Sequence, residues 1–139
     1  MSPRRTPERV RRPAPSPKAK AAWRQALGGR AFRDGHGAEW IAAAWLMAKG
    51  YQVLGFRLKA RGAEIDILAR QGKTIVVVEV KRRATLEAAL SAIDPRQLER
   101  LREAGAALLR QRPSFTGHRL RIDAVALAPG RFPRHRRDL

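Results

Sequence analysis

The chain lacks cysteine, has few acidic residues and contains no long apolar run. Without cysteine among its 139 residues, neither a disulfide framework nor a thiolate zinc site can form. The longest apolar run, from Trp40 to Ala48, is much shorter than the roughly 20 residues that cross a membrane. The first residues also lack the apolar stretch of a secretory signal. We therefore expect a cytoplasmic protein without a membrane partner.

The shortage of acidic residues leaves a strongly basic protein, with 30 Lys and Arg, 12 Asp and Glu and a net charge of +18. The excess is densest at the two ends, yet residues 35–128 alone carry sixteen basic and nine acidic side chains. A positive field of this size favours a polyanion, so DNA is the expected partner and RNA is the alternative. Charge that only maintains solubility is the competing explanation. An anionic membrane surface is a weaker one, because no long basic amphipathic helix stands out.

Composition divides the chain into an arm, one domain and a tail. Residues 1–33 combine five prolines with ten basic residues, so we expect a mostly disordered basic arm. Residues 34–128 are long enough for one folded domain. Residues 129–139 hold four basic residues and one acidic residue, and we assign them to a basic tail.

The hydrophobic pattern predicts an α/β fold in which a mixed sheet is flanked by helices. The first helix is apolar nearly all round, which predicts a buried helix rather than a surface-lying one. Asp94-Pro95 is a good start for the second helix, with a cap followed by proline. Residues 82–94 remain ambiguous between loop and helix. The predicted order is α-β-β-β-α-β, with helices at 36–49 and 95–110 and strands at 51–56, 63–70, 74–81 and 119–127.

The second and third strands form a predicted β-hairpin that carries charged residues in apolar surroundings. A two-residue loop at Gly72-Lys73 suits a type II′ turn and sets Asp66 opposite Glu79 and Glu64 opposite Lys81. A loop at Gln71-Gly72 would instead set Glu64 opposite Glu79, and a three-residue loop would separate the faces. We favour the first register.

Opposed carboxylates on a buried sheet repel each other and lose hydration, at a cost of several kcal/mol per ion. A divalent cation such as Mg²⁺ removes both problems, and Lys81 on the face of Glu79 can then stabilise charge that develops on a phosphate. The competing interpretation is an edge hairpin whose charged residues face solvent and contribute little to stability. The spacing alone does not decide between the two.

Two further polar residues lie on apolar helix faces. Glu39 shares a stripe with Ala42, Ala43 and Leu46, so it either joins a metal site or interacts with the helix dipole near the N-terminus. Gln97 also points inward, either as a core glutamine or as a group that reaches a phosphate or water.

These residues together resemble the PD-(D/E)xK nuclease superfamily, whose restriction-endonuclease-like core has the same α-β-β-β-α-β order. More closely, residues 35–128 resemble the YraN family, a bacterial family regarded as endonuclease-like. The combined spacing is specific, although no single piece is. The matching motifs are G-x-G-A-E-x-x-A-x-x-x-L at 35–46, the Gly50-Tyr51 turn, AEIDILA at 63–69, VVVEVKRR at 76–83 and RIDAVAL at 121–127.

The resemblance implies a site that binds Mg²⁺ or Mn²⁺ and no small-molecule cofactor. It implies metal ligation by Asp66, Glu79 and the Val80 carbonyl, with Glu39 as an additional acid. Lys81 is the implied catalytic lysine, and Gln97 occupies the usual glutamine position of the second helix. The sequence departs from the family at Ala38 and Ala63, where Gly is usual, at Arg57, where Asn is favoured, and at Arg96, where Lys is common.

The leading hypothesis is therefore a metal-dependent endonuclease that cuts DNA, with a structure-selective role in repair or recombination as one option. Its expected backbone contacts come from Arg61, Arg82, Arg83 and Arg96. The alternative is a non-catalytic nucleic-acid-binding module with a nuclease-like fold. A basic RNA- or ribosome-associated protein is a third option. The sequence leaves the substrate form and the oligomeric state open, although an exposed strand would suit a dimer.

Overall fold

The computed structural model describes residues 37–139, and the arm expected at residues 1–33 lies outside them. No helix in this range is long and apolar enough to cross a membrane. The elements in chain order are α3 (Gly37–Ala48), β1 (Gln52–Ala60), β2 (Ala63–Gln71), β3 (Thr74–Arg82), α4 (Leu86–Ser91), α5 (Pro95–Gln111), the short helix η1 (Pro113–Phe115), β4 (Arg119–Leu127) and β5 (Arg134–Arg136).

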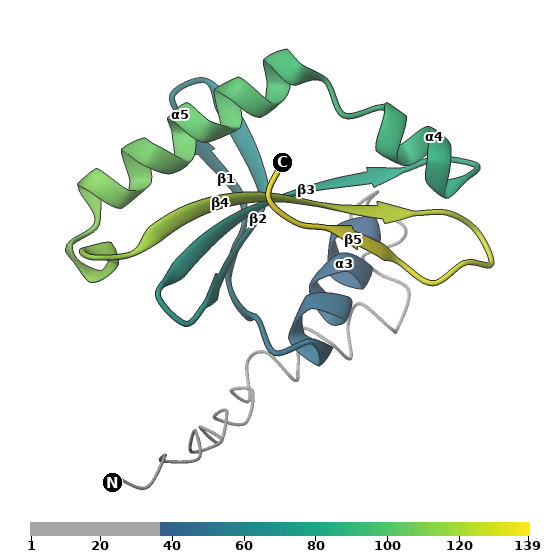
Figure 1. Ribbon diagram of the computed structural model, residues 1–139, viewed down its shortest axis with the longest axis horizontal. Coiled ribbons are helices and arrows are strands. Elements are labelled where there is room, and N and C mark those ends of the chain that lie inside the picture. The colour runs from purple at the N-terminus through teal and green to yellow at the C-terminus, as the bar shows by residue number, and fades with distance from the viewer. Residues whose placement is uncertain (1–36) are drawn as a thin grey trace, which may run out of the picture.

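One five-stranded mixed sheet of order β1-β2-β3-β4-β5 forms the centre of the molecule (Figure 1). Only the β3–β4 pair is parallel, and α4 and α5 make up the crossover between those two strands. Helix α3 covers one face of the sheet, which we call the α3 face. Helices α4 and α5 cover the other, which we call the α5 face. The predicted α/β class and the α-β-β-β-α-β order are confirmed.

The register of the β2–β3 hairpin is the one favoured from the sequence. Gln71 pairs with Thr74 and Ile67 with Val78, so Gly72 and Lys73 form the two-residue loop. Gly72 has a φ of 58°, whereas Lys73 is not among the residues with positive φ. This combination matches the type II′ turn that the sequence predicts.

The first helix and first strand differ from expectation. Helix α3 buries one face through Ala42, Ala43 and Leu46, while Ile41 is 37% exposed, so the predicted burial holds for only one face of the helix. Strand β1 continues to Ala60 instead of ending at residue 56, with a register shift between Val53 and Gly55.

The second helix begins where the sequence predicts. The Asp94 side chain accepts a hydrogen bond from the Arg96 backbone N–H at 2.9 Å, and Pro95 opens α5. Within the ambiguous stretch 82–94, Thr85 caps the short helix α4 by accepting from the Ala88 N–H at 3.1 Å. Gly105 lets α5 approach the sheet closely, because a Cβ there would lie 2.8 Å from Leu120 Cδ1.

The segment 129–139, assigned to a basic tail from sequence, contributes strand β5 to the sheet. Its anchor is Asp123 of β4, which is 0% exposed and accepts hydrogen bonds from Arg121 Nε at 2.8 Å and the Asp138 N–H at 3.1 Å. His135 Nε2 lies 2.7 Å from Asp123 Oδ2. Tyr51 extends the network by accepting from Arg121 at 2.7 Å. The ordered domain therefore continues beyond residue 128.

We predict that Gly105→Val destabilises the protein by about 1–3 kcal/mol, because the new side chain overpacks against Leu120 and Val77, whose Cγ2 lies 3.1 Å from the added Cβ. The free energy of unfolding measured in urea tests this. Glu103→Val, on the exposed face of the same helix, is the control for helix propensity and should change stability much less. Equal effects of the two variants would contradict the close packing.

Removal of the buried carboxylate in Asp123→Ala should cost about 3–5 kcal/mol, because Arg121 and the Asp138 N–H lose their acceptor. Burial alone would raise the pKa of Asp123, but hydrogen bonds from His135 and Arg121 outweigh it and hold the pKa below 3.8. A depressed folded-state pKa gives stability that is present above the unfolded-state pKa and is lost as pH falls through the folded-state pKa. Melting curves from neutral to acid pH should show this acid loss in the wild type and not in the variant.

Candidate metal and nucleic-acid site

The site forms where β2 and β3 stop pairing. Their hydrogen-bonded ladder ends at Ile67–Val78, and in Figure 1 the β1–β2 hairpin then turns away from β3. The Asp66 carboxylate fills the gap between the strands by accepting a hydrogen bond from the Val80 backbone N–H at 2.8 Å. Asp66 is thereby fixed beside the last residues of β3.

Glu79 lies across this gap with its carboxylate on the α5 face. The residue is 3% exposed, and its Oε1 accepts a hydrogen bond from Gln97 Nε2 of α5 at 2.9 Å. Lys81 Nζ lies 3.1 Å from the same oxygen. The structure therefore brings together four of the predicted site residues, namely Asp66, Glu79, Lys81 and Gln97.

Lys81 does not face Glu64, the residue that the predicted register sets opposite it. The sequence places Glu64 opposite Lys81, but the β2–β3 ladder ends before those residues and Glu64 aligns with Lys59 of β1 instead. Lys81 forms its ion pair with Glu79 on its own strand. The physical reason is the divergence of the strands, which moves the first residues of β2 away from the end of β3.

The two carboxyl groups strongly disfavour joint ionisation. Burial and the negative charge of Asp66 raise the pKa of Glu79 from 4.5 to about 7, although Lys81 lowers it. Burial also raises the pKa of Asp66 despite the hydrogen bond from Val80. Protonation of one of the two groups relieves their repulsion at low pH.

The second oxygen of Glu79 is the feature that points to a cation. Glu79 Oε2 is buried and has no hydrogen-bond donor among the residues that the structure describes. A buried carboxylate oxygen without a donor is costly unless a proton or a cation compensates it. The nearby donors are hard oxygen atoms, which suit Mg²⁺ or Mn²⁺ better than softer metals.

The residues present fit an ion that takes only part of its coordination from protein. Within residues 37–139 no group of three or more His, Asp or Glu side chains has the arrangement to hold a metal. Asp66, Glu79 and the Val80 carbonyl would therefore supply the protein ligands. Mg²⁺ is commonly bound in this way, through one or two carboxylates with water and substrate phosphate completing the shell.

Glu39 does not complete a three-carboxylate set. It lies on α3 with its side chain 16% exposed, and it accepts a hydrogen bond from Arg57 Nη1 of β1 at 3.4 Å. Arg57 has a left-handed φ of 49°, a conformation that asparagine tolerates better than arginine. Glu39 does share the inward face of α3 with Ala42, Ala43 and Leu46. On that face, however, its carboxylate pairs with Arg57.

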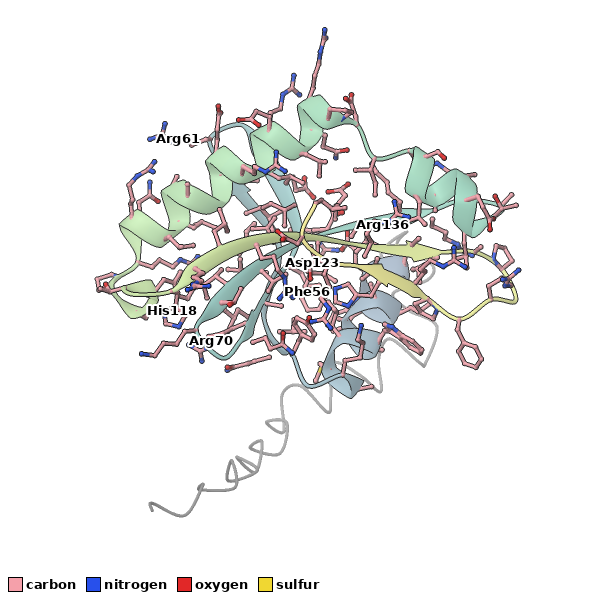
Figure 2. All side chains as sticks on the ribbon, viewed as in Figure 1. Phe56, Arg61, Arg70, His118, Asp123 and Arg136 are labelled. Carbon is pink, nitrogen blue, oxygen red and sulfur yellow. The ribbon has the colours of Figure 1, made fainter. Side chains whose placement is uncertain are left out.

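The four predicted backbone-binding arginines are all exposed and come from three places. Arg82 and Arg83 follow Lys81 directly at the end of β3, where the Arg83 N–H donates to the Leu127 carbonyl at 3.1 Å. Arg96 precedes Gln97 in the first turn of α5. Arg61 forms the β1–β2 turn with a φ of 48°, and Figure 2 shows it at the outer end of that hairpin.

Sequence reasoning missed two further basic residues on the α5 face, Arg134 and Arg136 of β5. Both are exposed, while His135 between them is turned to the α3 face by its contact with Asp123. The alternation in Arg-His-Arg was the available signal, but three residues are too few to predict a strand.

Relatives of this chain are found in several bacteria. A UPF0102 protein of Caulobacter vibrioides (strain NA1000 / CB15N) is 52% identical over 118 residues, which cover 85% of this chain and 94% of the relative. A UPF0102 protein of Methylorubrum extorquens (strain PA1) is 48% identical over 124 residues, covering 89% and 91% of the two chains. One of Parvibaculum lavamentivorans is 43% identical over 123 residues, covering 88% and 92%.

The family model described as Uncharacterised protein family UPF0102 matches residues 38–127. The matched range extends from the start of α3 to the end of β4 and contains Asp66, Glu79, Lys81 and Gln97. It ends before β5, which lies outside the matched residues. On the extent of this match and the identity to its relatives, the chain belongs to the UPF0102 family, which corresponds to YraN.

Proposed function

We propose that this protein is a Mg²⁺- or Mn²⁺-dependent nuclease of the PD-(D/E)xK superfamily that hydrolyses DNA phosphodiester bonds, most simply as an endonuclease. The observation that carries the proposal is the pairing of the half-buried Asp66 with the buried Glu79, whose Oε2 lacks a donor among the described residues while Lys81 lies 3.1 Å from its Oε1. Two facing acids and a lysine beside an open strand end are the groups that metal-assisted phosphodiester hydrolysis requires.

Each residue of the site has a separate role in this proposal. Asp66, Glu79 and the Val80 carbonyl would hold the ion, which when bound would polarise the phosphate and lower the pKa of water. Lys81 donates from its ammonium group to the negative charge that develops on the phosphate oxygens. Gln97 is a positioning residue, because its hydrogen bond at 2.9 Å holds Glu79 in place.

The surroundings of the site support a nucleic-acid substrate. The whole chain carries a net charge of +18, and the exposed Arg61, Arg82, Arg83 and Arg96 come from elements that border the site. Arginine binds phosphate oxygens in a bidentate manner, and such contacts hold the backbone without selecting a base sequence.

A second candidate function is a nucleic-acid-binding module that does not cut. The position of Glu39 favours it, because Arg57 engages the one additional acid that the resemblance assigns to the metal. The two functions share the basic surface and differ in what they require of Lys81. In the nuclease, Lys81→Ala abolishes cleavage and retains binding, whereas a binding module shows no cleavage even in the wild type.

We predict that Asp66→Ala and Glu79→Ala each abolish Mn²⁺-dependent nicking of supercoiled plasmid, because each removes a ligand of the ion. Glu64→Ala is the matched control, since it removes an exposed acid two residues from Asp66 on the same strand. It should nick like the wild type. Nicking that persists in both site variants would contradict the proposal, and DNA retention measured in EDTA should be similar in all of these proteins.

The stability of the protein without metal should decrease as pH rises from about 4.5 through about 7. The folded-state pKa of Glu79 is raised to about 7, so its contribution to stability is complete below the unfolded-state value of 4.5 and is lost as pH rises through the folded-state value. Bound Mg²⁺ replaces the proton, so the rise in melting temperature on adding Mg²⁺ should be larger near pH 8 than near pH 5.5.

Melting curves with and without Mg²⁺ at the two pH values test this prediction. Glu79→Gln should lose both the dependence on pH in this range and the effect of Mg²⁺, because its side chain neither ionises nor ligates as a carboxylate. A Mg²⁺ effect in Glu79→Gln equal to that in the wild type would place the ion elsewhere.

A further inference from the structure

The hairpin formed by β4 and β5 carries a set of features that the metal site does not explain. We call residues 128–136, which comprise the loop after β4 and strand β5, the hairpin arm. The arm continues from the end of β4 that neighbours Arg82, since Leu127 is the register partner of Arg82. It therefore lies at the same end of the sheet as Lys81.

The sheet register places two arginines of the arm on the face that carries the metal site. Glu79, Ala124 and Arg136 form one row across β3, β4 and β5. Lys81, Ala126 and Arg134 form the next row. Directly paired residues point to the same face of a sheet, and two strand spacings correspond to about 10 Å.

The opposite orientation of His135 supports this assignment independently. Its ring contacts Asp123 and packs edge-on against Tyr51 at 5.4 Å between centroids, on the α3 face. Its neighbours Arg134 and Arg136 consequently point to the α5 face, where only alanine separates them from the row positions of Lys81 and Glu79. Figure 2 shows Arg136 on the side of the sheet that α4 and α5 cover.

The positive charge of the arm is not neutralised within the described part of the chain. The arm, residues 128–136, contains three arginines and no acidic residue, and no carboxylate of residues 37–139 forms an ion pair with any of the three. Asp123 is already engaged by Arg121 and His135. The arm thus presents free guanidinium groups next to the proposed cleavage site.

The tip of the arm exposes an aromatic ring. Phe132 is 81% exposed and is one of two exposed large hydrophobic residues in residues 37–139, the other being Ile41. Trp45 of α3 packs against the ring at 6.0 Å between centroids, so the ring lies on the α3 side of the tip, whereas Arg134 and Arg136 point to the α5 face. Prolines at 129 and 133 and a turn at Gly130, with a φ of 69°, restrict the loop, so the ring is presented at a low entropic cost.

A nucleic acid with unpaired bases fits this combination better than a protein or a membrane. One phenylalanine ring offers far less area than the roughly 800 Å² per partner of a stable protein interface. Membrane-surface binding by a folded chain relies on a broad apolar helix face, which the arm lacks. Exposed aromatic rings among arginines are how single-stranded nucleic acid is held, through base stacking and phosphate contacts.

We propose that the hairpin arm holds an unpaired strand that passes over the tip of the arm to the metal site, with Phe132 stacked on a base at the α3 side of the tip and Arg134 and Arg136 on the phosphates at the α5 face. This proposal rests on the proposed nuclease function for the direction of the strand. It names the substrate class as nucleic acid with unpaired bases next to the scissile bond. Bases inside a duplex are stacked on each other and do not offer a face to Phe132.

Fluorescence anisotropy in EDTA tests the arm without cleavage, with single-stranded and duplex oligonucleotides of equal length. Phe132→Ala should weaken single-strand binding at least about fivefold and duplex binding less than about twofold, because only unpaired bases lose a stacking partner. Phe132→Trp should retain wild-type affinity for both. A ring this exposed contributes little to folding, so all three proteins should melt at similar temperatures.

Arg136→Ala should weaken binding to both oligonucleotides and reduce the salt dependence of affinity by about one phosphate contact. Arg110→Ala is the matched control, because it removes an equally exposed arginine from the last turn of α5, at the opposite end of the sheet in Figure 1. Its effect should be clearly smaller. Equal effects of Arg136→Ala and Arg110→Ala would overturn the assignment of Arg136.

Loss of single-strand and duplex affinity by the same factor in Phe132→Ala, or no loss in either, would overturn the role of Phe132. These binding outcomes do not depend on catalysis. If the wild type cuts nothing with Mg²⁺ or Mn²⁺ but its single-strand affinity depends on Phe132, the proposed nuclease function is wrong and the proposed role of the hairpin arm stands. If the wild type cuts and Phe132→Ala binds single strands normally, the nuclease function stands and the proposed role of the hairpin arm is wrong.

Discussion

One electrostatic constraint underlies the site: Glu79 is buried beside a second, half-buried acid, Asp66, at the point where β2 and β3 separate. The protein supplies three groups to offset this cost, namely the Val80 N–H on Asp66 and the Gln97 amide and Lys81 ammonium on Glu79. These groups leave Glu79 Oε2 without a donor in the described structure. The arrangement is therefore complete only when a proton or a cation is added.

A second buried acid in the same sheet shows what a purely structural carboxylate looks like. Asp123 is 0% exposed, yet Arg121, His135 and the Asp138 N–H surround both of its oxygens, and its pKa is lowered. Glu79 is buried almost as deeply, but its pKa is raised. Burial is similar in the two cases, so the difference lies in the number of donors. Asp123 anchors β5, whereas Glu79 is left able to bind something else.

Most of the fold could be predicted because local chemistry determines it. Gly72 takes the positive φ that a two-residue turn needs, which fixes the hairpin register, and Asp94 with Pro95 fixes the start of α5. The same register predicted that Asp66 and Glu79 share a face. Local patterns did not predict that the ladder ends at Ile67–Val78, because strand divergence depends on how the β1–β2 hairpin packs against α5.

The parts that could not be predicted depend on contacts between residues far apart in sequence. Glu39 meets Arg57 because of a left-handed residue in β1, which the residue pattern does not reveal. Strand β5 is three residues long and is held by Asp123, twelve residues before His135. Composition alone made that segment look like a tail, although Arg134 and Arg136 belong to the face that carries the site.

The central claim is that a divalent ion occupies the gap between Asp66 and Glu79. Anomalous diffraction from crystals soaked in Mn²⁺ tests it most directly. A manganese peak between the carboxylate oxygens of both residues and the Val80 carbonyl is the expected result. A map with no peak there, or with the two carboxyl groups hydrogen-bonded to each other in the presence of saturating Mn²⁺ above pH 7, would contradict it.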